Sequence, residues 1–380
     1  MSKRDRGARG VAGPSKGIER RTIVLGLGAV GAAVAAPSVF VAGGARAAAW
    51  PDRPINAVIM YSAGGGTDTV IRTIADEMAK ATGWTINAVN KPGAVGGVAT
   101  SFVLKKPSDG YWWLGAANYN KFVRVMGHSD SKAWEDWQYF QAANSIASWS
   151  VRADSPFKTL EDVITAAKAN PGKISISTSG TGGLWQELAL IVSEAAGIKL
   201  KYVPYKGGKP ATLAGLQGEV DIAGGGVHEH IEFIKAGQLR NLQQTGKTDL
   251  NVPGVGTLRS VGGIIPELKP LLPVGGIYNI ALRRDTPSEI LEQVKTAFIA
   301  ATKSKAFQDV AKAKYFDVDV LTGEAADRRA ALVEAVTAAT FSKVQDQIGK
   351  KVKTPEELGL PDPKDFDKWW PPKGYKPRMV

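Results

Sequence analysis

The sequence predicts an α/β fold with a mainly parallel sheet, built as two similar halves. Short apolar runs alternate with amphipathic segments of helical period after residue 50, the pattern of strands joined by crossover helices. Two glycine loops, at residues 64–66 and 179–183, each lie between a predicted strand and a predicted helix. Two lobes that face each other across a cleft would bring both loops to one ligand.

Residues 1–49 have the composition of an export signal. Eight basic and two acidic residues precede Trp50, the pair Arg20-Arg21 is followed by a Gly/Ala-rich apolar run at 23–36, and small-x-small cleavage sites occur at 45–49. The arginine pair indicates the twin-arginine route, which exports folded proteins. An uncleaved anchor is the weaker alternative, because the run is too short and too glycine-rich for a good membrane span. We therefore expect a periplasmic protein.

Composition excludes several classes of function. Without residues 1–49 the net charge falls from +12 to +6. No basic run with interleaved aromatics remains, so we expect no nucleic-acid partner, and the modest positive balance suits small anions. The absence of cysteine excludes thiolate metal sites and a cysteine nucleophile. A dinucleotide-like pattern at 26–31 lies inside the export signal without a preceding strand, and we interpret it as a chance match.

The first lobe begins with the strand–loop–helix unit of the first glycine loop. Apolar residues at 57–60 predict a buried strand, glycines 64–66 a tight turn, and apolar residues from Val70 to Met78 a helix whose N-cap candidates are Thr67 and Asp68. Such a helix start favours anions, although a turn without a ligand fits the pattern equally well. Further elements are predicted as a strand at 84–89, a helix at 98–105 and a strand at 111–116. The last strand ends at residues 118–120, at the sheet edge where ligands collect.

The second lobe repeats this arrangement. Helices are predicted at 160–169 and 184–196, and a third helix runs through 213–216. Strands are predicted at 173–178 and 220–223, and another strand ends in the segment 202–208. Glycines 224–226 are expected to close the strand at 220–223. Helices at 287–301 and 325–340 are expected to return to the first lobe. The expected organisation is residues 50–150 with 278–352 as lobe 1, 151–277 as lobe 2, and 353–380 as a C-terminal extension.

The C-terminal extension has an unusual composition. Six prolines and the pair Trp369-Trp370 in residues 354–380 exclude one regular element. We expect this tail to wrap over a lobe, because two adjacent tryptophans are rarely left in water, and a partner-docking arm is the alternative.

Neither a metal site nor a catalytic triad is supported. His228-Glu229-His230 would place two imidazoles on one face if extended, but no third ligand occurs at suitable spacing. No G-x-S-x-G motif and no serine–histidine–acid triad is present. We expect no metal and no cofactor.

Six ordered segments carry a family resemblance: MYSAGGGTDTVIR (60–72), VNKPGAVGGVAT (89–100), SDGYWWLGAAN (108–118), PGKISISTSGTGG (171–183), VPYKGGKPATLAGLQGEVD (203–221) and AGQLRNL (236–242). Together they resemble the periplasmic solute receptors of tripartite tricarboxylate transporters, the Bug or TctC-like family. The resemblance covers residues 50–349. It implies a two-lobed, type II periplasmic-binding-protein fold, with two mixed sheets flanked by helices, that closes on a small organic carboxylate and delivers it to membrane carrier subunits.

The resemblance also implies the ligand-binding residues. In the family, two glycine loops hold the carboxylate through backbone N–H groups, short hydroxyls and water. The matching positions of the first loop are Ser62, Ala63, Gly64, Gly65, Thr67 and Asp68. Those of the second loop are Thr178, Ser179, Gly180, Thr181 and Gly182. Two helix N-termini supply partial positive charge there without a buried lysine. An acid beside an anion is unusual, so the expected role of Asp68 is to cap its helix or orient a water. Asn118, Trp185 and Tyr205 complete the candidate set.

The sequence departs from the family pattern in four places. Residues 183–187 replace the usual serine and histidine of the second loop. Trp185 there favours an aromatic or bulkier carboxylate, with core packing as the alternative. Residues 118–120 are bulkier than usual, residues 223–226 are nearly all glycine, and the tail is extra. These departures argue against citrate-like specificity and leave the expected fold unchanged.

The sequence therefore predicts a binding protein rather than an enzyme. A ligand-sensing protein that signals to a membrane partner is one alternative, and a hydrolase that uses the same cleft is another. By family analogy we expect a monomer.

Overall fold

Strands from distant parts of the chain form one mixed sheet. The structure is a computed structural model that describes residues 50–378. The predicted export signal and the dinucleotide-like pattern lie outside the described residues. The strand order is β2-β1-β3-β12-β4, in which β1 pairs in parallel with both neighbours and β12 runs antiparallel to both of its own. These strands are β1 (Ile55–Ile59), β2 (Ile86–Asn90), β3 (Trp112–Ala117), β4 (Trp137–Asn144) and β12 (Ile277–Arg283).

The middle of the chain forms a second set of strands. β5 (Ala147–Arg152) lies between β8 (Ala223–Gly226) and β9 (Leu239–Gln244) in an antiparallel sheet, while β6 (Ser175–Thr178) and β7 (Lys201–Pro204) pair in parallel. A bridge between Ile176 and Ile222 links the two sheets. β10 (Leu250–Val252) and β11 (Gly256–Leu258) form a small antiparallel pair. The predicted α/β class with mixed sheets is confirmed, whereas the expectation of a mainly parallel sheet is wrong, because β12 pairs antiparallel with both β3 and β4, and β5 pairs antiparallel with both β8 and β9.

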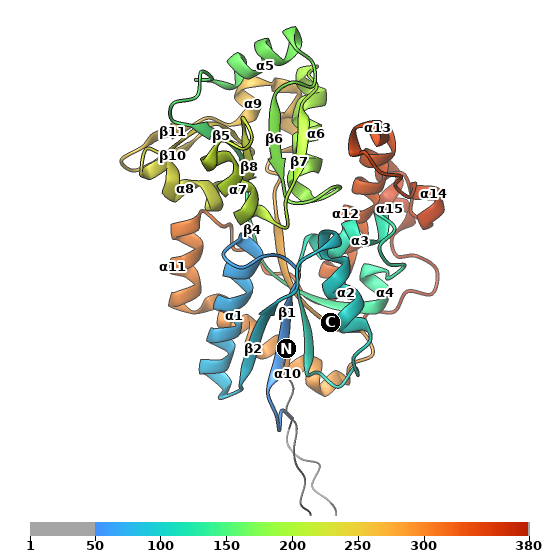
Figure 1. Cartoon of the computed structure of the whole chain (residues 1–380). Coiled ribbons are helices and arrows are strands. Elements are labelled where there is room, and N and C mark those ends of the chain that lie inside the picture. The colour runs from blue at the N-terminus through green and yellow to red at the C-terminus, as the bar shows by residue number, and fades with distance from the viewer. Residues whose placement is uncertain (1–49, 379–380) are drawn as a thin grey trace, which may run out of the picture. The chain divides into compact units, whose positions relative to one another are not determined.

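Helices pack against these sheets (Figure 1). The α-helices are α1 (Gly66–Thr82), α2 (Gly97–Leu104), α3 (Lys121–Val125), α4 (Ala133–Asp136), α5 (Leu160–Ala169), α6 (Leu184–Ala196), α7 (Gly208–Gln217), α8 (Val227–Lys235), α9 (Val261–Ile264), α10 (Ser288–Lys303), α11 (Lys305–Lys314), α12 (Gly323–Lys343), α13 (Gln345–Ile348), α14 (Pro355–Leu358) and α15 (Phe366–Trp369). Four short 3₁₀ segments are η1 (Ala94–Gly96), η2 (Asn118–Asn120), η3 (Pro266–Leu271) and η4 (Pro363–Asp365). Helices α1, α10 and α11 contact one another, and α12 contacts α3 and α4.

One predicted element is wrong. Glycines 224–226 were expected to close a strand at 220–223, but they form strand β8 itself. A Cβ atom at Gly224 would lie 2.3 Å from the Ser177 carbonyl oxygen, and one at Gly226 would lie 2.1 Å from the His228 ring. Glycine is therefore required here because neighbouring backbone and helix α8 approach this strand closely. The predicted helices at 160–169 and 184–196 are confirmed at both ends.

The C-terminal tail is irregular and packs on the protein. Its short helices α14, η4 and α15 are separated by turns. Trp369 meets the Trp134 ring edge-on at 6.0 Å, and Trp370 lies 4.9 Å from the Tyr375 ring. The Tyr375 hydroxyl donates to the buried Asp327 carboxylate of α12 at 2.8 Å. The tail therefore contacts α4 and α12.

Buried apolar side chains form a main cluster and two smaller ones. The main cluster draws on residues 55–147, 184–190 and 277–366, and the second on residues 149–274. The proposed lobe boundaries stay a prediction, because all described residues belong to one compact unit. Within residues 50–378, no helix has both the length and the apolar character that crossing a membrane requires.

A buried hydrogen bond between Arg124 and Glu334 joins α3 to α12. Arg124 Nη1 lies 3.3 Å from Glu334 Oε2, and both side chains are almost fully buried. Burial raises the pKa of the Glu334 carboxyl to about 7, although Arg124 opposes this shift. The native protein therefore holds a proton that the unfolded chain releases at lower pH.

We predict that Glu334→Gln gains stability relative to the wild type as the pH rises from about 4.5 to about 7. A carboxyl whose folded pKa is raised contributes most below its unfolded pKa, and that contribution is lost as the pH rises through the folded value. Urea denaturation at half-unit pH steps measures the difference in unfolding free energy. A difference that stays constant across this window would contradict the prediction.

Candidate functional site

The first glycine loop leaves a helix start open. Strand β1 passes through residues 60–65 into α1, whose N-cap is Gly65, with no side-chain hydrogen bond to the cap. Because the first N–H groups of a helix have no partner inside it, α1 points unpaired donors and partial positive charge beyond its start. Gly64 has φ +79°, which glycine adopts without strain.

Asp68 holds this loop in shape. One carboxylate oxygen accepts from the Gly64 N–H at 2.9 Å, and the other accepts from Arg72 Nε and Asn90 Nδ2, both at 2.8 Å. Asn90 in turn donates to the Tyr61 carbonyl at 2.9 Å. The prediction that Thr67 or Asp68 caps this helix is wrong, because the N-cap is Gly65 and no side chain bonds to the cap. Asp68 instead binds the loop before the helix to Arg72 and Asn90.

The second glycine loop repeats the open helix start. Strand β6 leads through residues 179–183 into α6, whose N-cap is Gly183, again without a side-chain cap. Gly180 and Gly182 have φ angles of +123° and +70°, and a Cβ atom at Gly182 would lie 2.2 Å from Met126 Sδ. The Ser179 hydroxyl accepts from the Trp185 N–H at 3.4 Å.

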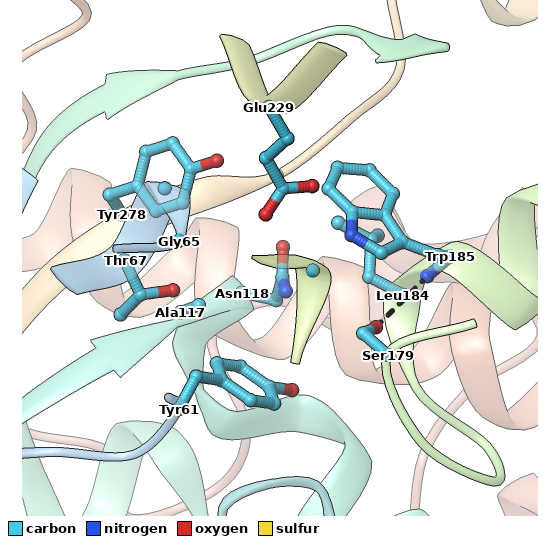
Figure 2. Close-up of a pocket in the computed structure, with 13 residues that line it drawn as sticks. Tyr61, Gly65, Thr67, Ala117, Asn118, Ser179, Leu184, Trp185, Glu229 and Tyr278 are labelled. Atoms are coloured by element: carbon cyan, nitrogen blue, oxygen red, sulfur yellow. Dashed lines mark hydrogen bonds between the residues drawn. The ribbon is translucent and has the colours of Figure 1, made fainter. Parts of the chain in front are cut away.

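Both helix starts line one pocket (Figure 2). Its volume is about 30 Å³, room for no more than about two water molecules. Residues from both sets of strands and their helices surround it: Tyr61, Gly65, Gly66, Thr67, Ala117, Asn118, Ser179, Leu184, Trp185, Gly208, Glu229, Gly276 and Tyr278. Among the residues predicted from sequence, the structure brings together Gly65, Thr67, Asn118, Ser179 and Trp185.

The other predicted residues lie around this pocket without lining it. The Ser62 hydroxyl donates to the Lys206 carbonyl at 2.7 Å, and the Tyr205 hydroxyl donates to Glu219 at 2.9 Å. Gly64 lines a separate cavity of about 110 Å³, and Thr178 and Thr181 line another of about 380 Å³. The remaining predicted residues, which also do not line the pocket, are Ala63, Asp68, Gly180 and Gly182.

Sequence reasoning missed several lining residues, above all Glu229 and Tyr278. Sequence reasoning weighed His228 and His230 as a metal pair in an extended segment and gave Glu229 between them no role, but residues 227–235 are helical. Neighbouring residues of a helix point in different directions, and His230 instead meets the hydroxyls of Ser148 and Ser150 at 3.0 Å. Burial lowers the pKa of His230 to about 4. Within residues 50–378, no group of three or more His, Asp or Glu side chains is arranged to hold a metal ion.

The polar groups of the pocket are tightly packed. The Tyr278 hydroxyl donates to Ser145 Oγ at 2.9 Å and lies 3.3 Å from His228 Nε2. A Cβ atom at Gly66 would lie 2.3 Å from the Tyr278 hydroxyl, so this helix start requires glycine. Burial raises the pKa of the Tyr61 and Tyr278 hydroxyls, which therefore stay protonated at neutral pH.

We predict that Asp68→Ala lowers the unfolding free energy by about 2 kcal/mol, because it removes a charged acceptor of three hydrogen bonds. Asp76→Ala is the matched control, since Asp76 is an exposed acid on the same helix. Chemical denaturation of both variants measures the effect. Equal losses in the two variants would show that Asp68 does not hold the loop.

The comparisons with known proteins agree with this architecture. The model of the family described as "Tripartite tricarboxylate transporter family receptor" (TctC) matches residues 70–341. The UPF0065 protein in the gbd 5′ region of Cupriavidus necator is 30% identical over 289 residues, which cover 74% of this chain and 84% of that protein.

Solved structures show the same fold at lower identity. Periplasmic binding protein BugD is 23% identical with a TM-score of 0.65, covering 82% of this chain and 99% of its own. Rpa4515 of R. palustris, solved with adipate, is 23% identical with a TM-score of 0.68, covering 80% of this chain and 99% of its own. The resemblance inferred from the six motifs is confirmed: the chain belongs to the family of tripartite tricarboxylate transporter receptors.

Proposed function

We propose that this protein captures a small organic carboxylate in the pocket and delivers it to the membrane carrier subunits of a tripartite transporter. The observation that carries the proposal is the convergence of two glycine-capped helix starts, α1 and α6, on one pocket. Unpaired N–H groups and helix dipoles favour an anion there. The family membership and the adipate bound to the relative from R. palustris support a carboxylate as that anion.

Ligand entry requires the pocket to open. A volume of about 30 Å³ is too small for a dicarboxylate. Hinge motion between residues 50–150 with 278–352 and residues 151–277, acting as two lobes, would expose both helix starts and then close them around the ligand. A monomer suffices for this cycle, and the ligand leaves unchanged.

The pocket residues make this proposal testable. We expect at least one member of a broad carboxylate panel to raise the melting temperature of the chain from residue 50, because a ligand that binds only the folded state stabilises it. Isothermal titration calorimetry then gives the Kd. No stabilisation by any member would overturn the proposal, and turnover of a bound carboxylate would replace it with an enzyme.

We predict that Thr67→Val weakens binding of that carboxylate about threefold to tenfold, the effect of losing one hydrogen bond of about 0.5–1.5 kcal/mol. Thr67 lines the pocket beside Gly65. Thr69→Val, the same change two residues further along α1, serves as the control and should retain the wild-type Kd. Equal Kd values in the two variants would remove Thr67 from the ligand-binding residues.

We further propose that the protein reaches the periplasm by the twin-arginine route. The support is the order of charged, apolar and small residues in the segment 1–49. Replacing Arg20 and Arg21 together by lysine should leave the precursor in the cytoplasm, as measured by cell fractionation and immunoblotting. Replacing Arg4 and Arg6 by lysine is the control, and unchanged export in both would exclude this route.

A further inference from the structure

The pocket contains one charged side chain, and it is an acid. Among the lining residues only Glu229 carries a charge, and no lysine or arginine accompanies it. Its side chain is 3% exposed. A site built only to hold an anion would exclude a carboxylate, because two buried negative charges repel each other strongly.

The carboxylate of Glu229 reaches into the space between the helix starts (Figure 2). A Cβ atom at Gly208, the first residue of α7, would lie 1.8 Å from Glu229 Oε1, and one at Gly65 would lie 3.4 Å from the same oxygen. Glycine at both positions lets the carboxylate approach the backbone of α7 and of the first loop. Close packing therefore fixes the position of the Glu229 carboxylate.

Glu229 keeps acceptor capacity toward the pocket. Oε2 accepts from the Gly226 N–H at 3.0 Å, whereas Oε1 lies 3.7 Å from His228 Nε2, beyond hydrogen-bond distance. Burial alone would raise the pKa of the Glu229 carboxyl, but His228 and the Gly226 N–H hold it below its usual value. An ionised carboxylate offers about four acceptor positions, so a ligand donor has a place to bind.

Aromatic rings surround the same space. Tyr61, Trp185 and Tyr278 line the pocket with Glu229 (Figure 2). The Tyr61 hydroxyl is buried and has no hydrogen-bond partner within residues 50–378. Aromatic faces attract cations, and a carboxylate forms its strongest hydrogen bonds with charged nitrogen donors. This combination is chemically suited to an ammonium group.

We propose that the ligand carries a cationic nitrogen in addition to its carboxylate, and that Glu229 binds this nitrogen and rejects a second carboxylate at the same place. The inference rests on the proposed function, because the helix starts of α1 and α6 take the carboxylate end. Glu229 is thus the residue that determines specificity for amino-substituted over dicarboxylic ligands.

The experiment compares matched probes by titration calorimetry on the chain from residue 50. For straight chains of four, five and six carbons, the probes are the plain monocarboxylate, its 2-amino and terminal-amino derivatives, and the dicarboxylate. We expect an amino derivative to bind at least tenfold more tightly than the monocarboxylate and the dicarboxylate of the same length. A tenfold change in Kd corresponds to about 1.4 kcal/mol.

Variants of Glu229 test whether its carboxylate causes the preference for amino derivatives. Glu229→Gln keeps an acceptor for the Gly226 N–H and should weaken the amino derivative at least tenfold without weakening the dicarboxylate. Glu229→Asp keeps the charge and should keep the preference. Glu232→Gln, on the same helix with a more exposed side chain, is the control and should retain wild-type binding. Circular dichroism and the melting temperature of each variant verify folding.

The outcomes separate this inference from the proposed function. If a dicarboxylate binds most tightly and Glu229→Gln leaves the order of the probes unchanged, the inference is overturned and the carboxylate receptor stands. If Glu229→Gln lowers the Kd of every probe by the same factor, the inference is also overturned, since Glu229 would then only obstruct the pocket. If no probe binds at any length and the broad carboxylate panel also fails, both proposals fall.

Discussion

The pocket depends on a buried ion pair that fixes the start of α6. Lys121 Nζ of α3 donates to both oxygens of Glu187, at 2.8 and 3.1 Å, and the Thr337 hydroxyl of α12 donates to the same carboxylate at 2.6 Å. Removing two charges from water is costly, and good geometry with extra hydrogen bonds offsets that cost. Because Glu187 lies in the first turn of α6, these contacts hold Leu184 and Trp185 against the main core cluster and beside the first glycine loop.

The electrostatic character of the pocket depends on the lack of cationic side chains among the residues that line it. The N-cap glycines of α1 and α6 provide no side-chain cap. Backbone N–H groups of both first turns therefore remain available to an anion, apart from the Trp185 N–H, which donates to the Ser179 hydroxyl. Lys121 pairs with Glu187 and Arg72 with Asp68, and neither cation lines the pocket. Glu229 then provides the only full charge, which separates the pocket into a part suited to an anion and a part suited to a cation.

Local sequence patterns predicted the strands, the helices and the half of the pocket that lies in strand–loop–helix units. Gly65, Thr67 and Ser179 belong to that half because each follows a strand and begins a helix within a few residues. Glu229 and Tyr278 escaped prediction because their position depends on tertiary structure. Tyr278 reaches the pocket because β12 returns antiparallel to β3, some 160 residues later. Glu229 reaches it from α8, which follows β8 directly. The register of such distant strands is not encoded in a local pattern.

Strand β8 constrains how this sequence can change during evolution. Residues 224–226 contribute backbone alone, and the first Cβ atom added at Gly224, Gly225 or Gly226 would collide with the Ser177 carbonyl, the His230 ring or the His228 ring respectively. Substitution is therefore restricted at three consecutive positions, by backbone at Gly224 and by imidazole rings at Gly225 and Gly226. A smaller residue at position 228 would make room for a side chain at position 226, but it would leave the backbone contact at Gly224 unchanged. The order of substitution in this segment is thus set by packing, with a smaller residue at 228 needed before any non-glycine residue at 226.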